Sequence, residues 1–212
     1  MHIPPYTTLG QILERNARWF PDRPAFVLGD DRLTYRQLYQ RGSRLASALE
    51  KAGVVQQARI GILSQNSLEH FEIFAAGDIG GFISAPVSFR AAPPELEWLL
   101  TDSGATVLFF EHIYADTVEG LRGKLPNIGL YVCIGGLAPE WARDYEGVLA
   151  TGDPDGPLHR STMDDYADLF YTSGTTGRPK GVPHTHKTAI ISARAVAHHE
   201  ALSLLQISPA FH

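Results

Sequence analysis

The chain has 212 residues, of which 44% are hydrophobic, a proportion that is ordinary for a globular protein and sufficient for a core. The net charge of −5 offers no basic surface for nucleic acid, and no apolar run approaches the length of a membrane span. Cys133 is the only cysteine, which excludes an internal disulfide. Residues 1–5 lack the pattern of a secretion signal, so we expect a cytoplasmic location.

The first part of the chain predicts two helices separated by a hairpin. Thr8 and Thr34 are each followed three residues later by glutamine, the spacing of a capping box that opens a helix. Residues 25–32 between these helices predict a short strand and a turn. Gly53 is placed to end the second helix, because glycine tolerates the left-handed conformation that follows a helix C-cap.

From residue 58 onward, apolar strands alternate with amphipathic helices. Strands are expected at 59–63, 83–87, 106–110 and 128–134. Between them, helices are expected after a cap formed by Asn66 with Glu69, from Pro93 and from His112. This alternation predicts an α/β fold with a doubly wound, mostly parallel sheet and helices on both faces. No catalytic constellation falls in this part of the chain.

A segment rich in turn-forming residues, 151–164, separates this unit from the C-terminal part of the chain. We therefore expect a first α/β subdomain over residues 1–168. Residues 169–212 then form a strand, a loop, a second strand and the beginning of another subdomain. A helix is expected to begin at Thr185 or His186, and residues 202–207 form a further apolar segment.

The loop of this second region, residues 171–181, has the composition of a phosphate-binding loop. Its polar and flexible residues are Thr172, Ser173, Gly174, Thr175, Thr176, Gly177, Lys180 and Gly181. Glycines allow successive backbone N–H groups to face an anion, hydroxyls add donors, and Lys180 adds a compact positive charge. The alternative is a flexible surface linker, although a linker does not need a lysine held between Pro179 and Gly181. The spacing differs from that of the P-loop of nucleotide hydrolases.

Residues 171–181 resemble the signature of the adenylate-forming (AMP-binding) superfamily, which includes acyl-CoA synthetases, peptide-synthetase adenylation domains and firefly luciferase. Residues 33–38 (Leu-Thr-Tyr-Arg-Gln-Leu) resemble an early element of that family. Residues 86–90, with Pro94-Glu95-Leu96 after them, are most similar to acyl-CoA synthetases. Residues 209–212 resemble the aromatic-histidine motif beside the acyl pocket, which implies that His212 binds substrate.

The resemblance implies ATP-dependent activation of a small-molecule carboxylic acid as an acyl-adenylate, followed by thioester formation with coenzyme A. ATP, Mg²⁺ and coenzyme A are the implied cofactors, and the polar residues of the phosphate loop are the implied ATP contacts. The sequence ends at His212, before the adenine-binding segment, the magnesium-binding acid, the ribose-binding aspartate and the catalytic lysine of the family. We therefore expect no catalytic residue in this fragment and no ligase activity from it alone.

Two other functions stay open at this point. The chain could be a non-catalytic anion-binding or interaction module that keeps the fold, or part of a peptide-synthetase adenylation domain. The apolar residues Ile190, Val196, Leu204, Leu205 and Ile207 predict self-association through an exposed C-terminal segment, or poor order there. The histidines at 184, 186, 198 and 199 share no ligand spacing with one another, so we expect no metal site among them.

Overall fold

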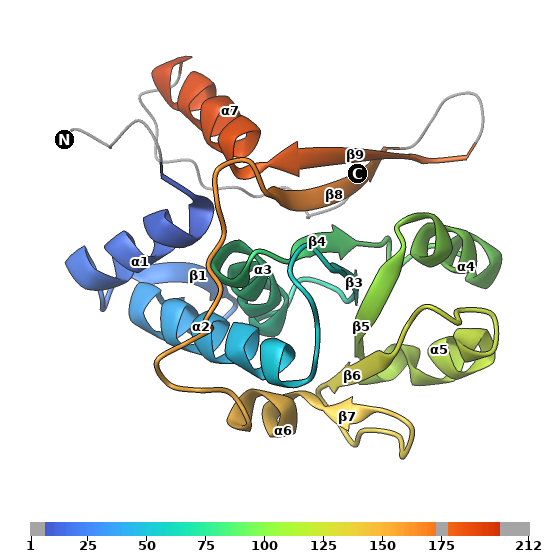
Figure 1. The fold of residues 1–212 in the computed structure, drawn as a ribbon. Helices are drawn as coiled ribbons and strands as arrows, with labels where there is room; N and C mark the ends of the chain where they lie inside the picture. Colours follow the sequence, from blue (N-terminus) through green and yellow to red (C-terminus); the bar gives the residue numbers. More distant parts are fainter. Residues whose placement is uncertain (1–6, 173–177, 200–212) are drawn as a thin grey trace.

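The computed structural model describes residues 7–172 and 178–199, with side chains described as far as residue 194. Its strands are β1 (Pro24–Leu28), β2 (Asp31–Thr34), β3 (Arg59–Leu63), β4 (Ile83–Pro86), β5 (Ala105–Glu111), β6 (Leu130–Ile134), β7 (Arg143–Asp144), β8 (Tyr166–Thr172) and β9 (Lys180–Thr185). Its helices are α1 (Leu9–Trp19), α2 (Tyr35–Lys51), α3 (Leu68–Gly80), α4 (Pro93–Asp102), α5 (Ala115–Arg122), α6 (Tyr145–Ala150) and α7 (His186–His199), with a 3₁₀ turn, η1 (His112–Tyr114), before α5. Figure 1 shows their arrangement.

The main sheet of the described residues has seven strands in the order β7-β6-β5-β3-β4-β8-β9. Every neighbouring pair is parallel except β8 and β9, which are antiparallel. β1 and β2 form a separate antiparallel hairpin. The predicted α/β class with a mostly parallel sheet is therefore confirmed.

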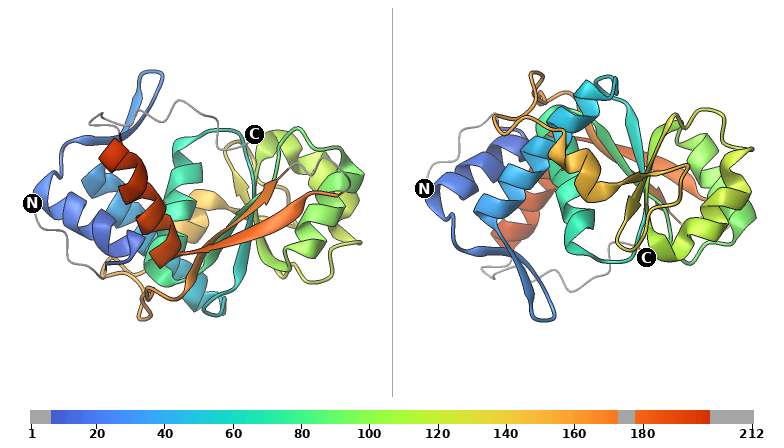
Figure 2. Two further views of the ribbon diagram at one scale, coloured as in Figure 1. Left: turned by 90° about the horizontal axis from the view of Figure 1, so that it is seen from above. Right: turned by 90° about the horizontal axis from the view of Figure 1, so that it is seen from below.

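The interior strand β5 shows why both faces of the sheet carry helices. Successive side chains of a strand point to opposite faces. Val107 and Phe109 pack in one buried cluster with residues of α2, α3 and α6. Leu108 and Phe110 pack in a second cluster with residues of α4 and α5. Both faces are thus apolar, and Figure 2 shows the two groups of helices on opposite sides of the sheet.

The two predicted capping boxes are present. Thr8 Oγ1 accepts a hydrogen bond from the backbone N–H of Gln11, and Thr34 Oγ1 accepts one from Gln37, each over 3.2 Å. The predicted cap at Asn66 is wrong, because α3 begins one residue later. Ser67 has the extended backbone of an N-cap, and its Oγ accepts from the N–H of His70 over 3.1 Å.

Further along, four local features differ from expectation. The strand expected at 128–134 begins only at Leu130, and the helix expected from His112 opens as the 3₁₀ turn η1. β7 and α6 were not predicted, although Asp144 Oδ2 caps α6 by accepting from the N–H of Gly147 over 2.7 Å.

In the described residues no helix combines the length and the apolar character needed to cross a membrane.

The helix α7 lies beside α1, where the backbone N–H of Leu9 donates to His186 Nδ1 over 3.3 Å. Ile190, expected to belong to an exposed apolar segment, is buried at 6% exposure, because it faces the rest of the protein from the second turn of α7. Its neighbour Ile191 is exposed. The side chain of Val196, and Leu204, Leu205 and Ile207, lie outside the described residues.

Candidate functional site

The phosphate loop joins β8 to β9 at one end of the sheet. The antiparallel register pairs Tyr171 with Gly181 and Thr172 with Lys180. β8 also runs parallel to β4, through the pair Ser84 and Asp168. The loop therefore leaves β8 at the same edge where β4 and its parallel neighbours end (Figure 1). Open α/β sheets bind their ligands outside this carboxyl edge.

Two of the predicted phosphate contacts stand opposite each other where the hairpin opens. Thr172 and Lys180 are both exposed, and Thr172 Oγ1 donates to the Lys180 carbonyl over 3.5 Å. An exposed ammonium and an exposed hydroxyl at one strand end suit an anion. Five further predicted contacts, Ser173, Gly174, Thr175, Thr176 and Gly177, lie outside the described residues, as does His212.

Gly181, the remaining predicted contact, lies close to neighbouring side chains. A Cβ atom built on Gly181 would lie 3.1 Å from Leu169 Cδ1 and 3.4 Å from Tyr171 Cε1. The absence of a side chain therefore lets the Tyr171 ring lie against the paired strand.

A second cation, which the sequence reasoning did not single out, flanks the loop. Arg178 is exposed, and its guanidinium carbon lies 5.7 Å from the centre of the Trp98 ring. This arrangement holds the guanidinium near the hairpin base by a cation–π contact with α4. Arg178 and Lys180 together place two positive charges on the β9 side of the loop.

The base of the hairpin is attached to α4. The Tyr171 hydroxyl donates to Asp102 Oδ2 over 2.8 Å, and the Tyr171 ring meets Trp98 edge-on at 5.9 Å between centroids. Burial, together with this hydrogen bond to the carboxylate, raises the pKa of the Tyr171 phenol. The phenol therefore stays protonated and acts as a donor. No motif in the sequence points to Trp98 or Asp102 in this role.

Polar groups behind the other strand ends are already paired with each other. After β3, the backbone N–H of Gln65 donates to Glu111 Oε1 over 2.8 Å. Ser64 Oγ and His70 Nδ1, both fully buried, lie 2.7 Å apart. Burial lowers the pKa of His70 to about 4, so the imidazole is neutral at physiological pH. These pairs support the sheet edge structurally.

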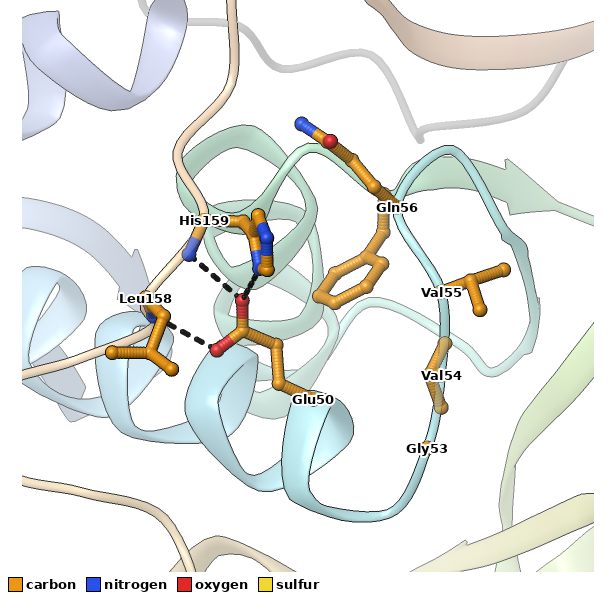
Figure 3. Close-up of a pocket in the computed structure, with 9 residues that line it drawn as sticks. Glu50, Gly53, Val54, Val55, Gln56, Leu158 and His159 are labelled. Carbon is orange, nitrogen blue, oxygen red and sulfur yellow. Dashed lines mark hydrogen bonds and ion pairs between the residues drawn. The ribbon is translucent and has the colours of Figure 1, made fainter.

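A cavity of about 400 Å³ lies away from this edge, between the end of α2 and the segment at Leu158 and His159 (Figure 3). Glu50 accepts hydrogen bonds from both backbone N–H groups, over 2.8 and 2.9 Å, and lies 2.9 Å from His159 Nδ1. Burial alone would raise the pKa of Glu50, but these hydrogen bonds lower it. The carboxylate is thus used to hold the 158–159 segment on α2, and we assign it a structural role.

Among the side chains that the structure describes, in residues 7–172 and 178–194, no three His, Cys, Asp or Glu groups converge as a metal site would require. Cys133 is buried within the second cluster, where burial raises the pKa of its thiol. It is a core residue.

In a comparison with known protein families, residues 13–212 match the family described as AMP-binding enzyme. The fatty acid–[acyl-carrier-protein] ligase ScoC of Streptomyces coeruleorubidus is 32% identical over 93% of this chain and 36% of its own length. A feruloyl-CoA synthase of Amycolatopsis is 37% identical over 84% of this chain and 33% of its own length. The chain thus spans about a third of the length of these curated relatives.

Solved structures show the same similarity. The anthranilate CoA ligase AuaEII, in complex with anthranoyl-AMP, superposes with a TM-score of 0.84 and 30% identity over 91% of this chain and 37% of its own. A long-chain-fatty-acid CoA ligase from Rhodopseudomonas palustris, described as putative, superposes with a TM-score of 0.86 and 29% identity. It is matched over 98% of this chain and 52% of its own.

Proposed function

The chain belongs to the family of AMP-binding enzymes, and on that premise we propose that the protein containing it activates a carboxylic acid with ATP as an acyl-adenylate. We propose further that the acyl group then passes to the thiol of coenzyme A. The relatives are named as ligases and synthetases of fatty-acid, feruloyl and anthranilate type, which supports a small carboxylic acid as the substrate. The observation that carries the proposal is the exposed Thr172–Lys180 pair at the carboxyl edge of the sheet.

In this reaction the carboxylate oxygen attacks the α-phosphorus of ATP, and pyrophosphate leaves with the electrons of the broken P–O bond. The protein must hold the triphosphate in line and stabilise the charge that develops on the leaving group. Lys180 and Thr172 are suited to this role because both project from the strand ends that flank the loop. We assign the same role to Ser173, Gly174, Thr175, Thr176, Gly177 and Gly181 on the resemblance of residues 171–181 to the family signature.

Mg²⁺ would reduce the negative charge of the triphosphate when bound. The described residues offer no cluster of acidic ligands for it, so we assign no residue of this part of the chain to the metal. His212 remains our proposed contact for the acyl group. We also propose that residues 1–168 form one subdomain and that residues 169–212 open the next.

The experiment is to trap the acyl-adenylate. The protein containing this chain is incubated with ATP and a panel of aliphatic and aromatic carboxylic acids, and hydroxylamine converts any acyl-adenylate to a hydroxamate. The proposal predicts hydroxamate and pyrophosphate with at least one acid, and acyl thioester when coenzyme A replaces hydroxylamine. ATP binding without hydroxamate for any acid would support a non-catalytic anion-binding module. Transfer to a carrier-protein thiol alone would overturn the coenzyme A step.

A further inference from the structure

A second cavity, of about 510 Å³, lies between α1, β1, α3 and the middle of β8. It lies within the size range of ligand pockets. Its walls include the aromatic rings of Phe26, Phe71, Phe74 and Phe170. Phe26 and Phe71 stack at 3.7 Å between centroids, and Phe74 stacks with Phe170 at 6.5 Å. The faces of aromatic rings carry the negative end of a quadrupole, which attracts cations.

Two carboxyl groups line the same cavity, Asp78 from α3 and Asp168 from β8. Asp168 is only 8% exposed, and its Oδ1 atom has no hydrogen-bond partner among the described residues. A buried carboxylate oxygen without a donor is costly. Burial raises the pKa of Asp168 to about 7, and burial with repulsion from Asp168 raises that of Asp78 further above its usual range.

The described residues that line the cavity include no lysine or arginine to balance these carboxyl groups. The lining does include His70, but burial lowers the pKa of this imidazole to about 4. The imidazole is therefore neutral at the pH at which the carboxyl group of Asp168 ionises. The cavity combines an aromatic wall with an uncompensated negative charge, so it would favour a ligand that supplies both an apolar body and a positive charge.

We propose that this cavity is a binding site for a small organic cation, an aralkyl or alkyl ammonium whose charged end pairs with Asp168 and whose apolar part contacts the phenylalanine rings. The ammonium group would donate to the Asp168 carboxylate, which lines the cavity, and so supply the positive partner that this carboxylate lacks there. A neutral analogue of the same shape can offer at most an uncharged hydrogen bond, which stabilises a buried carboxylate less than an ammonium does. This site shares no lining residue with the Thr172–Lys180 pair, so the inference does not depend on the function proposed above.

The test is isothermal titration calorimetry of the chain at mildly alkaline pH with phenethylammonium, and in parallel with phenethyl alcohol as the neutral probe. We expect saturable binding of the ammonium and binding of the alcohol that is at least about tenfold weaker, the effect of one charge-assisted hydrogen bond. Asp168→Asn should weaken the binding of phenethylammonium by a similar factor. The matched control is Asp164→Asn, which removes an exposed carboxyl group in the preceding turn and should leave the affinity unchanged.

A third variant, Phe74→Leu, keeps an apolar side chain in the wall but removes a ring face, and it should weaken the binding of both probes. It also keeps the test decisive if Asp168→Asn does not fold. The proposal is overturned if phenethylammonium fails to bind, or if the alcohol binds as tightly. Equal affinity of Asp168→Asn and the unchanged chain would overturn it as well, and would leave the cavity as an apolar hollow without charge selectivity.

Discussion

Tyr171 donates a hydrogen bond of 2.8 Å to Asp102 Oδ2 and so ties the strand that enters the phosphate loop to the last residue of α4. The two residues are 69 positions apart in the chain. The ring of Tyr171 also meets Trp98 edge-on, which adds a contact that does not depend on the hydroxyl. The geometry of the loop base is therefore set by the first α/β unit.

Tyr171→Phe removes this hydrogen bond and keeps the ring contact. We expect the free energy of unfolding to fall by about 0.5–1.5 kcal/mol, the usual net value of one hydrogen bond. Equilibrium unfolding in urea measures the change. Asp102→Asn, which keeps an acceptor oxygen, should cost less. An Asp102→Asn variant as destabilised as Tyr171→Phe would contradict the assignment of Asp102 as a simple acceptor.

Glu72 is the centre of a buried polar network between α2, α3 and α6. It accepts from Arg41 Nε over 2.6 Å and from the Tyr145 hydroxyl over 2.7 Å. Glu72→Ala leaves a partly buried guanidinium and a buried phenol without their acceptor, so we expect a loss of about 3 kcal/mol or more. Glu146, the other partner of Arg41, is 62% exposed, and Glu146→Ala should cost below about 1 kcal/mol. Similar losses in urea unfolding for both variants would refute this ranking.

Burial of Asp168 makes the stability of the protein fall as the pH rises. The ordinary pKa of 3.8 is raised to about 7 in the folded protein, so between these values the folded state binds more protons than the unfolded chain. Its contribution to the free energy of unfolding is therefore present at acid pH and lost as the pH rises through about 7. Asp168→Asn should be the more stable protein above neutral pH, by an amount on the order of a few kcal/mol.

The difference between the two proteins is the quantity to measure, because buried His186 acts in the opposite direction. Burial lowers its pKa to about 4, so stability is lost as the pH falls below its ordinary value of 6.5. Thermal unfolding of the unchanged chain and Asp168→Asn, compared from pH about 4 to about 8, isolates the aspartate. A difference that does not vary with pH would contradict the raised pKa of Asp168.

Two glycines in helices should respond to alanine in opposite ways. A Cβ on Gly10 of α1 would lie 2.5 Å from the Asp78 carbonyl oxygen in α3, so Gly10→Ala forces the helices apart and should cost about 1–3 kcal/mol. Gly120 of α5 has no atom within 4 Å of such a Cβ. Gly120→Ala should therefore stabilise the protein by about 0.5–1 kcal/mol, through helix propensity alone. Thermal unfolding that shows the same sign for both would contradict the α1–α3 packing.

The fold was predictable where its determinants are local. The capping boxes at Thr8 and Thr34 depend on residues three positions apart. The burial of β5 on both sides follows from successive side chains that point to opposite faces of the sheet. Asn66 and Ser67 are both favourable N-cap residues by type, so the sequence does not distinguish them. In the structure the N-cap is Ser67, which has the extended backbone of that position. α6 escaped prediction because its Tyr145 is held by Glu72, 73 residues earlier.

The candidate site divides in the same way. Lys180 and Thr172 could be identified because the residues around them form a recognisable run. Trp98, Asp102 and Arg178 could not, because their relation to the loop comes from the packing of α4 against the hairpin. The pairing of Asp78 with Asp168 also required the structure, since one residue comes from a helix and the other from a strand 90 positions later.

The central claim is that the hairpin between β8 and β9 holds the phosphates of ATP. The rate of ATP–pyrophosphate exchange in the protein containing this chain tests it most directly. Lys180→Ala should reduce the rate by about a hundredfold or more, the usual effect of removing one preorganised charge from a developing anion. Lys187→Ala, an exposed lysine at the start of α7, is the matched control and should leave the rate unchanged. A Lys180→Ala protein that exchanges pyrophosphate as fast as the Lys187→Ala control would contradict the account.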